Sequence, residues 1–265
     1  MLCALRSIVV YSSNPDARSL YSAIEAVGAR VLWFDEWDSF DDARRGSSCA
    51  VVHVNCPQTD PAVARLRRAA QGAPQSPLVL VVQGTALGEA LARSLSVDEV
   101  VVKREANRSL LPAISRATGA AYLRDVGSRV RDAHHLPVRL RIAVAHACHS
   151  SNPVKEVADL ADRVGCDRST LTRQWQRVTQ PGDAMRLDEV LSWLVLLRAV
   201  ARRPPGRKWA SVAAEVGTSE RTLARVARQH VGLSLGALTS LDFAALTSAF
   251  ELRVVSRMVG SSGAS

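Results

Sequence analysis

The sequence predicts two domains of different class: an α/β domain built on a doubly wound parallel sheet, then an all-α domain with two helix-turn-helix units. Three observations support this prediction. The chain has 265 residues and 47% hydrophobic content, whereas a single domain usually has roughly 100 to 200 residues. Short Val-rich runs alternate with helical stretches over residues 7–118. The segment LADRVGCDRSTLTR at residue 160 returns as VAAEVGTSERTLAR at residue 212.

The first half of the chain alternates strand and helix patterns. The strand candidates are the apolar runs SIVVYSS, ARVLWF, CAVVHVNCP, PLVLVVQG and EVVVKRE. The helix candidates are DARSLYSAIEAVG, AVARLRRAAQG, ALGEALARSL and RSLLPAISRATG. Continuous apolar strands joined by helices predict a parallel sheet that is covered on both faces.

This order of elements resembles the receiver domain of response regulators. The likeness is clearest in SVDEVVVKREANRSLLPAISRA, where Lys103 follows the last strand and a closing helix comes next. It covers roughly residues 5–118 and implies a receiver-like, flavodoxin-like fold. We therefore place the first domain at residues 1–120.

The phosphorylation pocket that the resemblance implies is degenerate in this chain. In receivers an acidic pair after the first strand holds Mg²⁺, an aspartate ends the third strand, and a hydroxyl residue follows the fourth. Mg²⁺ prefers oxygen ligands such as carboxylates, and these are missing at the matching positions. The residues at the pocket positions are Ser12, Ser13, His53, Val82 or Gln83, and the retained Lys103.

We therefore expect a domain that keeps the fold, is not phosphorylated, and serves dimerisation or the sensing of a partner or ligand. A ligand would bind at the carboxyl ends of the strands. Two alternatives stay open: metal binding through Asp16 or Asp35, and a phosphorylatable or ligand-sensing His53 instead of a packed polar side chain.

The segment after this domain predicts a connector and no chemistry. Residues 121–137 read as a helical linker that breaks near Pro137. Histidines and one cysteine gather loosely at residues 134–149, but no second pair at structural-zinc spacing follows, so we expect no metal and no cofactor. No phosphate-binding glycine loop, GxSxG or HExxH motif occurs, so we expect no enzyme.

The distribution of charge and the number of cysteines indicate which partners and which compartment to expect. From Arg139 to the end, 18 basic residues face 11 acidic ones, against 16 and 14 before it. The basic second half favours a polyanion partner, although a merely soluble basic surface gives the same count. Five scattered cysteines without a CxxC pair favour reduced thiols in the cytoplasm. Without a signal peptide or about 18 consecutive apolar residues, we expect no membrane association.

Residues 138–240 carry one helix-turn-helix pattern twice, 52 positions apart. In each copy a glycine, Gly165 or Gly217, ends the first helix and lets the chain turn. Asp167 and Ser219 can then cap a second helix, in which apolar residues recur every three or four positions. Small residues where the two helices cross complete the pattern.

A single long helix is predicted between the two copies, from Met185 to Arg203. Its 19 residues would run roughly 28 Å, close to the roughly 34 Å between successive major-groove turns of DNA. The whole arrangement resembles the DNA-binding domain of the AraC/XylS family. The matching residues are Gly165, Leu171 and Arg173 in the first unit, and Arg186, Leu187, Arg198 and Ala199 in the connecting helix.

The resemblance implies double-stranded DNA as the partner, read by the outward residues of the two second helices. Arginine suits guanine through its two-pronged guanidinium, whereas serine and threonine discriminate less between bases. Thr218 departs from the family, which usually has an aromatic residue after the second glycine. The candidate DNA-binding residues are Arg168, Ser169, Thr172, Arg173, Gln174, Glu220, Arg221, Arg225 and Arg228.

The interpretation that follows is a transcription regulator that forms a homodimer, with an RNA polymerase contact left open. Residues 241–265 predict a helix with one apolar stripe, packed on the DNA-binding domain, and a disordered tail. Two alternatives remain. One is an adaptor that uses the helix-turn-helix face to hold another protein, and the other is a phosphorylation-dependent response regulator.

Overall fold

The computed structural model describes residues 7–14, 24, 29–54, 61–69, 76–84, 90–91, 95, 97–150, 152–178, 185–203, 206–241 and 243–259. The chain forms two compact units, Met1–Ala121 and Tyr122–Ser265. Within the described ranges, no helix combines the length and the apolar character that a membrane span requires.

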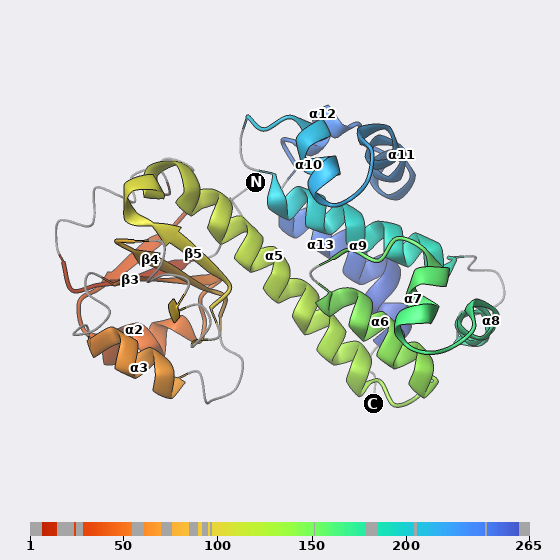
Figure 1. Ribbon diagram of the computed structural model, residues 1–265, viewed down its shortest axis with the longest axis horizontal. Coiled ribbons are helices and arrows are strands. Elements are labelled where there is room, and N and C mark those ends of the chain that lie inside the picture. The colour runs from red at the N-terminus through yellow and green to blue at the C-terminus, as the bar shows by residue number, and fades with distance from the viewer. Residues whose placement is uncertain are drawn as a thin grey trace. The chain divides into compact units, whose positions relative to one another are not determined.

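The first unit is built on a five-stranded parallel sheet (Figure 1). Its strands are β1 (Ile8–Ser12), β2 (Val31–Phe34), β3 (Cys49–Val54), β4 (Leu78–Val82) and β5 (Glu99–Val102). They lie in the order β2-β1-β3-β4-β5, and every neighbouring pair is parallel. This is the strand order of flavodoxin-like, doubly wound folds, so the predicted α/β class is confirmed.

Successive side chains of each strand enter two different cores, because strand side chains alternate between the faces of a sheet. In β3, Val51 joins the core beneath helix α5 (Ala106–Asp132), together with Leu110 and Ile114. Val52 joins the opposite core, beneath α2 (Trp37–Arg44) and α3 (Pro61–Ala69). All six residues of β3 are buried, as expected of the central strand of a covered sheet.

Helix α2 is absent from the sequence-based prediction, because its segment WDSFDDAR is dominated by polar residues. Its apolar signal is two aromatic residues one turn apart, Trp37 and Phe40, which are 6% and 0% exposed. Their ring centroids lie 5.1 Å and 5.7 Å from the ring of Tyr11 on β1. Two large buried side chains therefore hold this helix on the sheet, although its overall composition is polar.

The second unit is helical, which confirms the predicted all-α class. The predicted connector, residues 121–137, consists of the second half of α5 and the turn before α6. The remaining elements are α6 (Val138–His149), α7 (Val157–Arg163), α8 (Arg168–Val178), α9 (Leu187–Arg202), α10 (Trp209–Glu215), α11 (Glu220–Val231), α12 (Leu235–Leu238), α13 (Phe243–Phe250), the π-helical turn η3 (Glu251–Val255) and α14 (Ser256–Val259).

Helix α9 is the centre of this unit, with twelve of its sixteen residues buried. It contacts α6, α7, α10, α11 and α13. The Trp193 ring is fully buried and lies 5.7 Å from the ring of Phe250 on α13. The C-terminal helix therefore packs on the helical core through its apolar stripe, of which Leu246, Phe250, Val254 and Met258 are buried.

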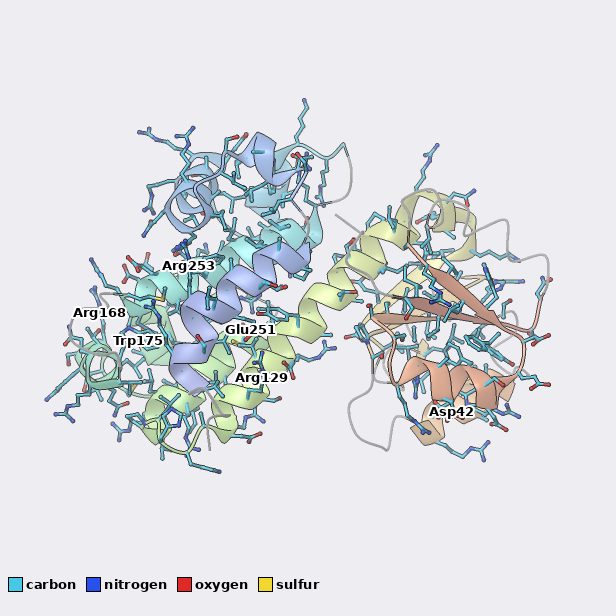
Figure 2. All side chains as sticks on the ribbon, turned by 180° about the vertical axis from the view of Figure 1, so that it is seen from behind. Asp42, Arg129, Arg168, Trp175, Glu251 and Arg253 are labelled. Atoms are coloured by element: carbon cyan, nitrogen blue, oxygen red, sulfur yellow. The ribbon has the colours of Figure 1, made fainter. Side chains whose placement is uncertain are left out.

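A polar cluster ties the second half of α5 to η3. The guanidinium of Arg129 binds both carboxylate oxygens of Glu251, with Nη1 at 3.1 Å from Oε2 and Nη2 in a closer contact with Oε1 (Figure 2). The Tyr122 hydroxyl donates to Glu251 Oε1 at 3.0 Å, and partial burial with this carboxylate raises the pKa of Tyr122. The cluster joins residues more than 120 positions apart in sequence.

Arg198 of α9 closes the end of α6. Its Nη2 donates to the carbonyls of Ala147 at 2.7 Å, Cys148 at 3.0 Å and Ser150 at 3.0 Å, which the end of a helix leaves without intrahelical donors. The side chain is 7% exposed, and burial lowers its pKa to about 10, so it stays charged at neutral pH. The arginine of the Arg-Ala motif is thus a helix cap in the core.

Arg198→Met should lower the free energy of unfolding of the second unit by about 2 to 4 kcal/mol, because three carbonyls at the end of α6, two of them buried, lose their donor. Urea unfolding followed by the helical circular dichroism signal measures the change. Arg131→Met, at an exposed arginine of α5, is the control and should stay within about 0.5 kcal/mol of wild type. Equal urea midpoints for Arg198→Met and wild type would contradict the capping role.

Candidate nucleic-acid interface

The two predicted helix-turn-helix units have the same backbone. Helices α7 and α8 form the first and α10 and α11 the second, and both turns pass through a left-handed glycine, Gly165 at φ 64° and Gly217 at φ 69°. The following amides, of Cys166 and Thr218, donate to the carbonyls of Ala161 and Ala213 at 3.0 Å and 2.8 Å. Both predicted turns are therefore present.

The start of each second helix is defined by its first hydrogen bonds. Ser219 caps α11, because its Oγ accepts the amide of Thr222 at 3.0 Å, as predicted. At α8 the carbonyl of Asp167 accepts the amide of Leu171 at 3.2 Å. The side-chain cap predicted for Asp167 stays a prediction.

Each second helix buries one side and presents the other. On α8 the buried residues are Leu171 and Trp175, and on α11 they include Leu223 and Ala227. The outward residues at spacings of three, four and seven positions form two equivalent sets, offset by 52. We call them the α8 face, which is Ser169, Thr172, Arg173 and Gln176, and the α11 face, which is Arg221, Ala224, Arg225 and Arg228.

The structure places most of the predicted DNA-binding residues on these faces or beside them. Arg168 and Glu220 are exposed and occupy equivalent places in the first turns of α8 and α11. Thr172 is half-buried, and its Oγ1 donates to the carbonyl of Arg168 at 3.0 Å. Gln174 lies off the face, because its position matches the buried Val226. Its Oε1 is enclosed without a hydrogen-bond partner among the described residues.

Gln176 is an interface candidate that the sequence-based set omits. It is exposed on α8 at the position that Arg228 takes on α11. The signal that identifies it is the 52-residue offset itself, applied position by position. Side-chain polarity alone does not separate it from Gln174.

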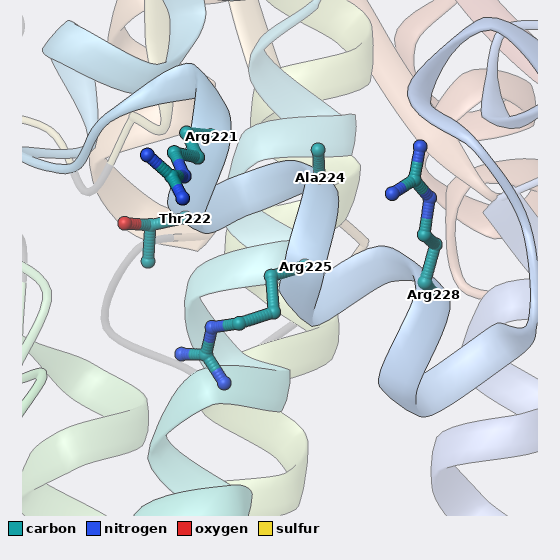
Figure 3. Close-up of a pocket in the computed structure, with 5 residues that line it drawn as sticks. All are labelled: Arg221, Thr222, Ala224, Arg225 and Arg228. Carbon is teal, nitrogen blue, oxygen red and sulfur yellow. The ribbon is translucent and has the colours of Figure 1, made fainter.

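The outward arginines are not neutralised. Within the described part of the chain, Arg168, Arg173, Arg221, Arg225 and Arg228 form no ion pair, whereas Arg163, Arg186 and Arg207 of the same unit each hold a carboxylate. On α11 the arginines, with Thr222 and Ala224, line an open pocket of about 390 Å³ (Figure 3). This places uncompensated positive charge on a helix surface that can enter a groove of nucleic acid.

One arginine of the α11 face is held by neighbouring side chains. Arg225 Nη1 donates to Gln229 Oε1 at 3.3 Å, and Gln229 Nε2 donates to Glu189 Oε1 at 3.3 Å. Glu189 lies in the first turn of α9, where its Oε2 accepts the backbone amide of Arg186 at 3.4 Å. The series of hydrogen bonds thus anchors Arg225 to the start of the connecting helix.

The inner side of α11 is fixed by His230. Its ring stacks on Trp193 with centroids 4.7 Å apart, and its Nε2 lies 2.6 Å from Ser192 Oγ. Ser192 Oγ donates to the Glu189 carbonyl at 2.8 Å, so it accepts from the imidazole N–H. Arg253 Nη1 donates to the His230 carbonyl at 2.6 Å. Helix α11 is therefore attached to both α9 and η3.

A further contact joins the two helix-turn-helix units directly. The ammonium of Lys155, just before α7, donates to the carbonyl of Gly217 in the turn between α10 and α11. A lysine at the last carbonyls of a helix also interacts favourably with the helix dipole. This contact and the shared packing on α9 fix the two units relative to each other.

The receiver-like pocket of the first unit contains a buried polar pair. Ser12 at the end of β1 lies opposite His53 of β3, with Oγ and Nδ1 3.2 Å apart, and the two residues are 7% and 0% exposed. Ser12 Oγ also donates to the carbonyl of Asn14 at 3.0 Å. A serine and an imidazole thus lie near the carboxyl ends of β1 and β3, at the positions where the predicted receiver pocket would need carboxylates.

The other predicted pocket residues lie around this pair. Ser13 and Gln83 are exposed after β1 and β4, and Lys103 is partly exposed after β5. Asp35 follows β2 and is exposed, whereas Asp16 lies outside the described residues. Among the residues that the structure describes, no three His, Cys, Asp or Glu side chains are arranged to hold a metal ion.

No family model matches this chain, and no curated protein matches it significantly. Among solved structures, full-length FixJ from B. japonicum is similar to this chain, with a TM-score of 0.32 and 18% sequence identity. The match covers 86% of this chain and 98% of that chain.

The stability of the second unit should depend on the protonation of His230. Burial, followed by the charges of Arg253 and Arg225, lowers its pKa from 6.5 to about 4. Between these values the unfolded chain binds a proton that the folded chain excludes, so stability is complete above pH 6.5 and decreases as the pH falls towards 4. We expect a loss of about 1 to 2 kcal/mol between pH 7 and pH 5.

Urea unfolding at the two pH values measures this loss. His230→Gln, which cannot titrate, is the comparison and should show a clearly smaller loss over the same interval. The assignment to His230 would be wrong if the wild type and the variant lost the same free energy.

Proposed function

We propose that this protein is a regulator of transcription that binds double-stranded DNA sequence-specifically, with α8 and α11 in successive turns of the major groove. The pair of outward faces is the observation that supports this proposal most. One scaffold is built twice, with equivalent glycines, turn hydrogen bonds and buried residues. Apart from Ala224, its outward positions are polar or basic, and they hold arginines without ion pairs among the described residues.

The connecting helix supports the use of both faces on one duplex. At 1.5 Å per residue, the 16 residues of α9 run about 24 Å, the same order as the roughly 34 Å from one major-groove turn to the next. Both α8 and α11 are seen nearly end-on in Figure 1, so their axes have similar orientations in this unit. Two helices of similar axis orientation, each packed in a unit that contacts α9, suit neighbouring grooves on one side of DNA.

For the first unit we propose dimerisation or the sensing of a partner or ligand, without phosphorylation. The buried Ser12–His53 pair supports this, because neither side chain supplies the carboxylate that Mg²⁺ and aspartyl phosphorylation need. A homodimer in the cytoplasm would place two DNA-binding units on one operator, where they can meet RNA polymerase.

Fluorescence anisotropy of the full chain with a labelled duplex tests DNA binding. Arg173→Ala and Arg225→Ala should each cost about 1 to 3 kcal/mol of sequence-specific binding, because each removes a guanidinium from an outward face. The logarithm of affinity should fall linearly with the logarithm of salt concentration. Arg131→Ala makes the same charge change at an exposed arginine of α5, outside both faces as defined above, and should leave the affinity near wild type.

The same titration separates DNA binding from the adaptor alternative. An adaptor that uses these helices to hold a protein would bind no duplex even at low salt. That result would overturn the proposed function.

A small acyl-phosphate donor tests the first unit. Incubation of the full chain with the donor and Mg²⁺ should leave its mass unchanged by intact-protein mass spectrometry, because no carboxylate stands at the pocket positions. A known phosphorylatable receiver under the same conditions is the positive control. An added phosphoryl group that maps to residues 1–120 would show a phosphorylation-dependent switch instead.

A further inference from the structure

We infer that Arg225 is the base-reading arginine of α11, that Gln229 and Glu189 position it for guanine, and that Arg221 and Arg228 bind phosphates. This inference rests on the proposed function, since it assigns roles within the α11 face in contact with DNA. It also separates three chemically identical side chains by their surroundings.

The surroundings of the three arginines differ in the structure. Arg225 donates to Gln229 at 3.3 Å, and Gln229 in turn donates to Glu189 at 3.3 Å. Among the described residues, neither Arg221 nor Arg228 has a hydrogen bond from its guanidinium or an ion pair. Figure 3 shows the guanidinium of Arg228 apart from those of Arg221 and Arg225.

An oriented guanidinium is suited to base recognition. Guanine is read through O6 and N7 by two parallel N–H donors, and this contact requires the plane of the fork to be set. A hydrogen bond from Nη1 to Gln229 restricts that plane before DNA arrives and leaves the other donors of Arg225 for the base. Restricting a side chain in its bound orientation increases affinity, because less conformational freedom is lost on binding.

Phosphate binding makes no such demand. A phosphate attracts positive charge from a range of directions, so a mobile arginine serves it well. Arg221 and Arg228 lie four residues before and three residues after Arg225 on the same face. They therefore flank the base-reading side chain along the helix, where they can meet the phosphates of the DNA backbone on either side.

The first helix-turn-helix unit has an equivalent arginine but lacks the hydrogen bond that holds it. Arg173 of α8 is equivalent to Arg225, but the position equivalent to Gln229 is Arg177. An arginine has no acceptor atom, so it cannot receive a hydrogen bond from Arg173. The oriented guanine reader therefore belongs to α11 alone, and Arg177 supplies a matched control position.

Selection from a pool of randomised duplexes tests the assignment, with the full chain as the binding protein. The wild type should enrich a motif with a guanine that Arg225→Ala no longer enriches. Gln229→Met keeps the side-chain length without polar atoms and should lose the same guanine while its melting temperature stays unchanged. Arg177→Met should keep the whole motif. Arg221→Ala and Arg228→Ala should also keep it, while each lowers the salt slope by about 1.

A second readout separates positioning from a general structural effect. The selected duplex is synthesised with 7-deazaguanine at that position, which removes the N7 acceptor and nothing else from the contact. Wild-type affinity should fall about 10-fold, and that of Gln229→Met by no more than about 3-fold, since its contact is already weakened. Glu189→Gln keeps an acceptor for Gln229 and should respond to 7-deazaguanine as the wild type does.

The outcomes distinguish this inference from the proposed function. If no duplex is bound at low salt, the proposed function and the inference both fail. If a motif is enriched but Gln229→Met keeps its guanine, or Arg221→Ala loses it, DNA binding stands and the positioning role is overturned.

Discussion

The burial of α9 is the constraint on which the second unit depends. Twelve of its sixteen residues are removed from solvent, and helices from both helix-turn-helix units pack on it. Because the two units share this one core, neither can rotate without disturbing the packing of the other. The spacing of the two outward faces is therefore set by the packing on α9.

Polar contacts supplement this core at the places where helices end. Arg198 reaches from α9 to the last carbonyls of α6. Lys155 reaches the turn of the second helix-turn-helix unit, and Glu251 joins η3 to α5 through Arg129. Arg198 and Lys155 donate to carbonyls at helix ends that the local backbone leaves unpaired, whereas Glu251 pairs with an opposite charge. These contacts explain why charged residues are present in an otherwise apolar helical core.

The two outward faces show how a repeated scaffold acquires different chemistry. The buried positions are restricted by packing, and one of them, Leu171 in α8 and Leu223 in α11, is the same residue in both copies. The outward positions have no such restriction, so Ser169 and Gln176 can stand where the second copy has Arg221 and Arg228. The proposed hydrogen-bonded support of Arg225 exists in one copy only, because Gln229 is replaced by Arg177 in the other.

The sequence by itself determined the fold class, the two helix-turn-helix units and most of both outward faces. Each is encoded locally, by the period of apolar residues, by glycine at a left-handed turn and by the 52-residue offset. Helix α2 escaped prediction because two buried aromatics outweigh a polar composition only once the sheet is present. The cap by Arg198, the buried Ser12–His53 pair and the support of Arg225 from Glu189 join residues 36 to 51 positions apart. Only the tertiary structure could decide these contacts, because the pattern of a strand or a helix does not specify which distant element it meets.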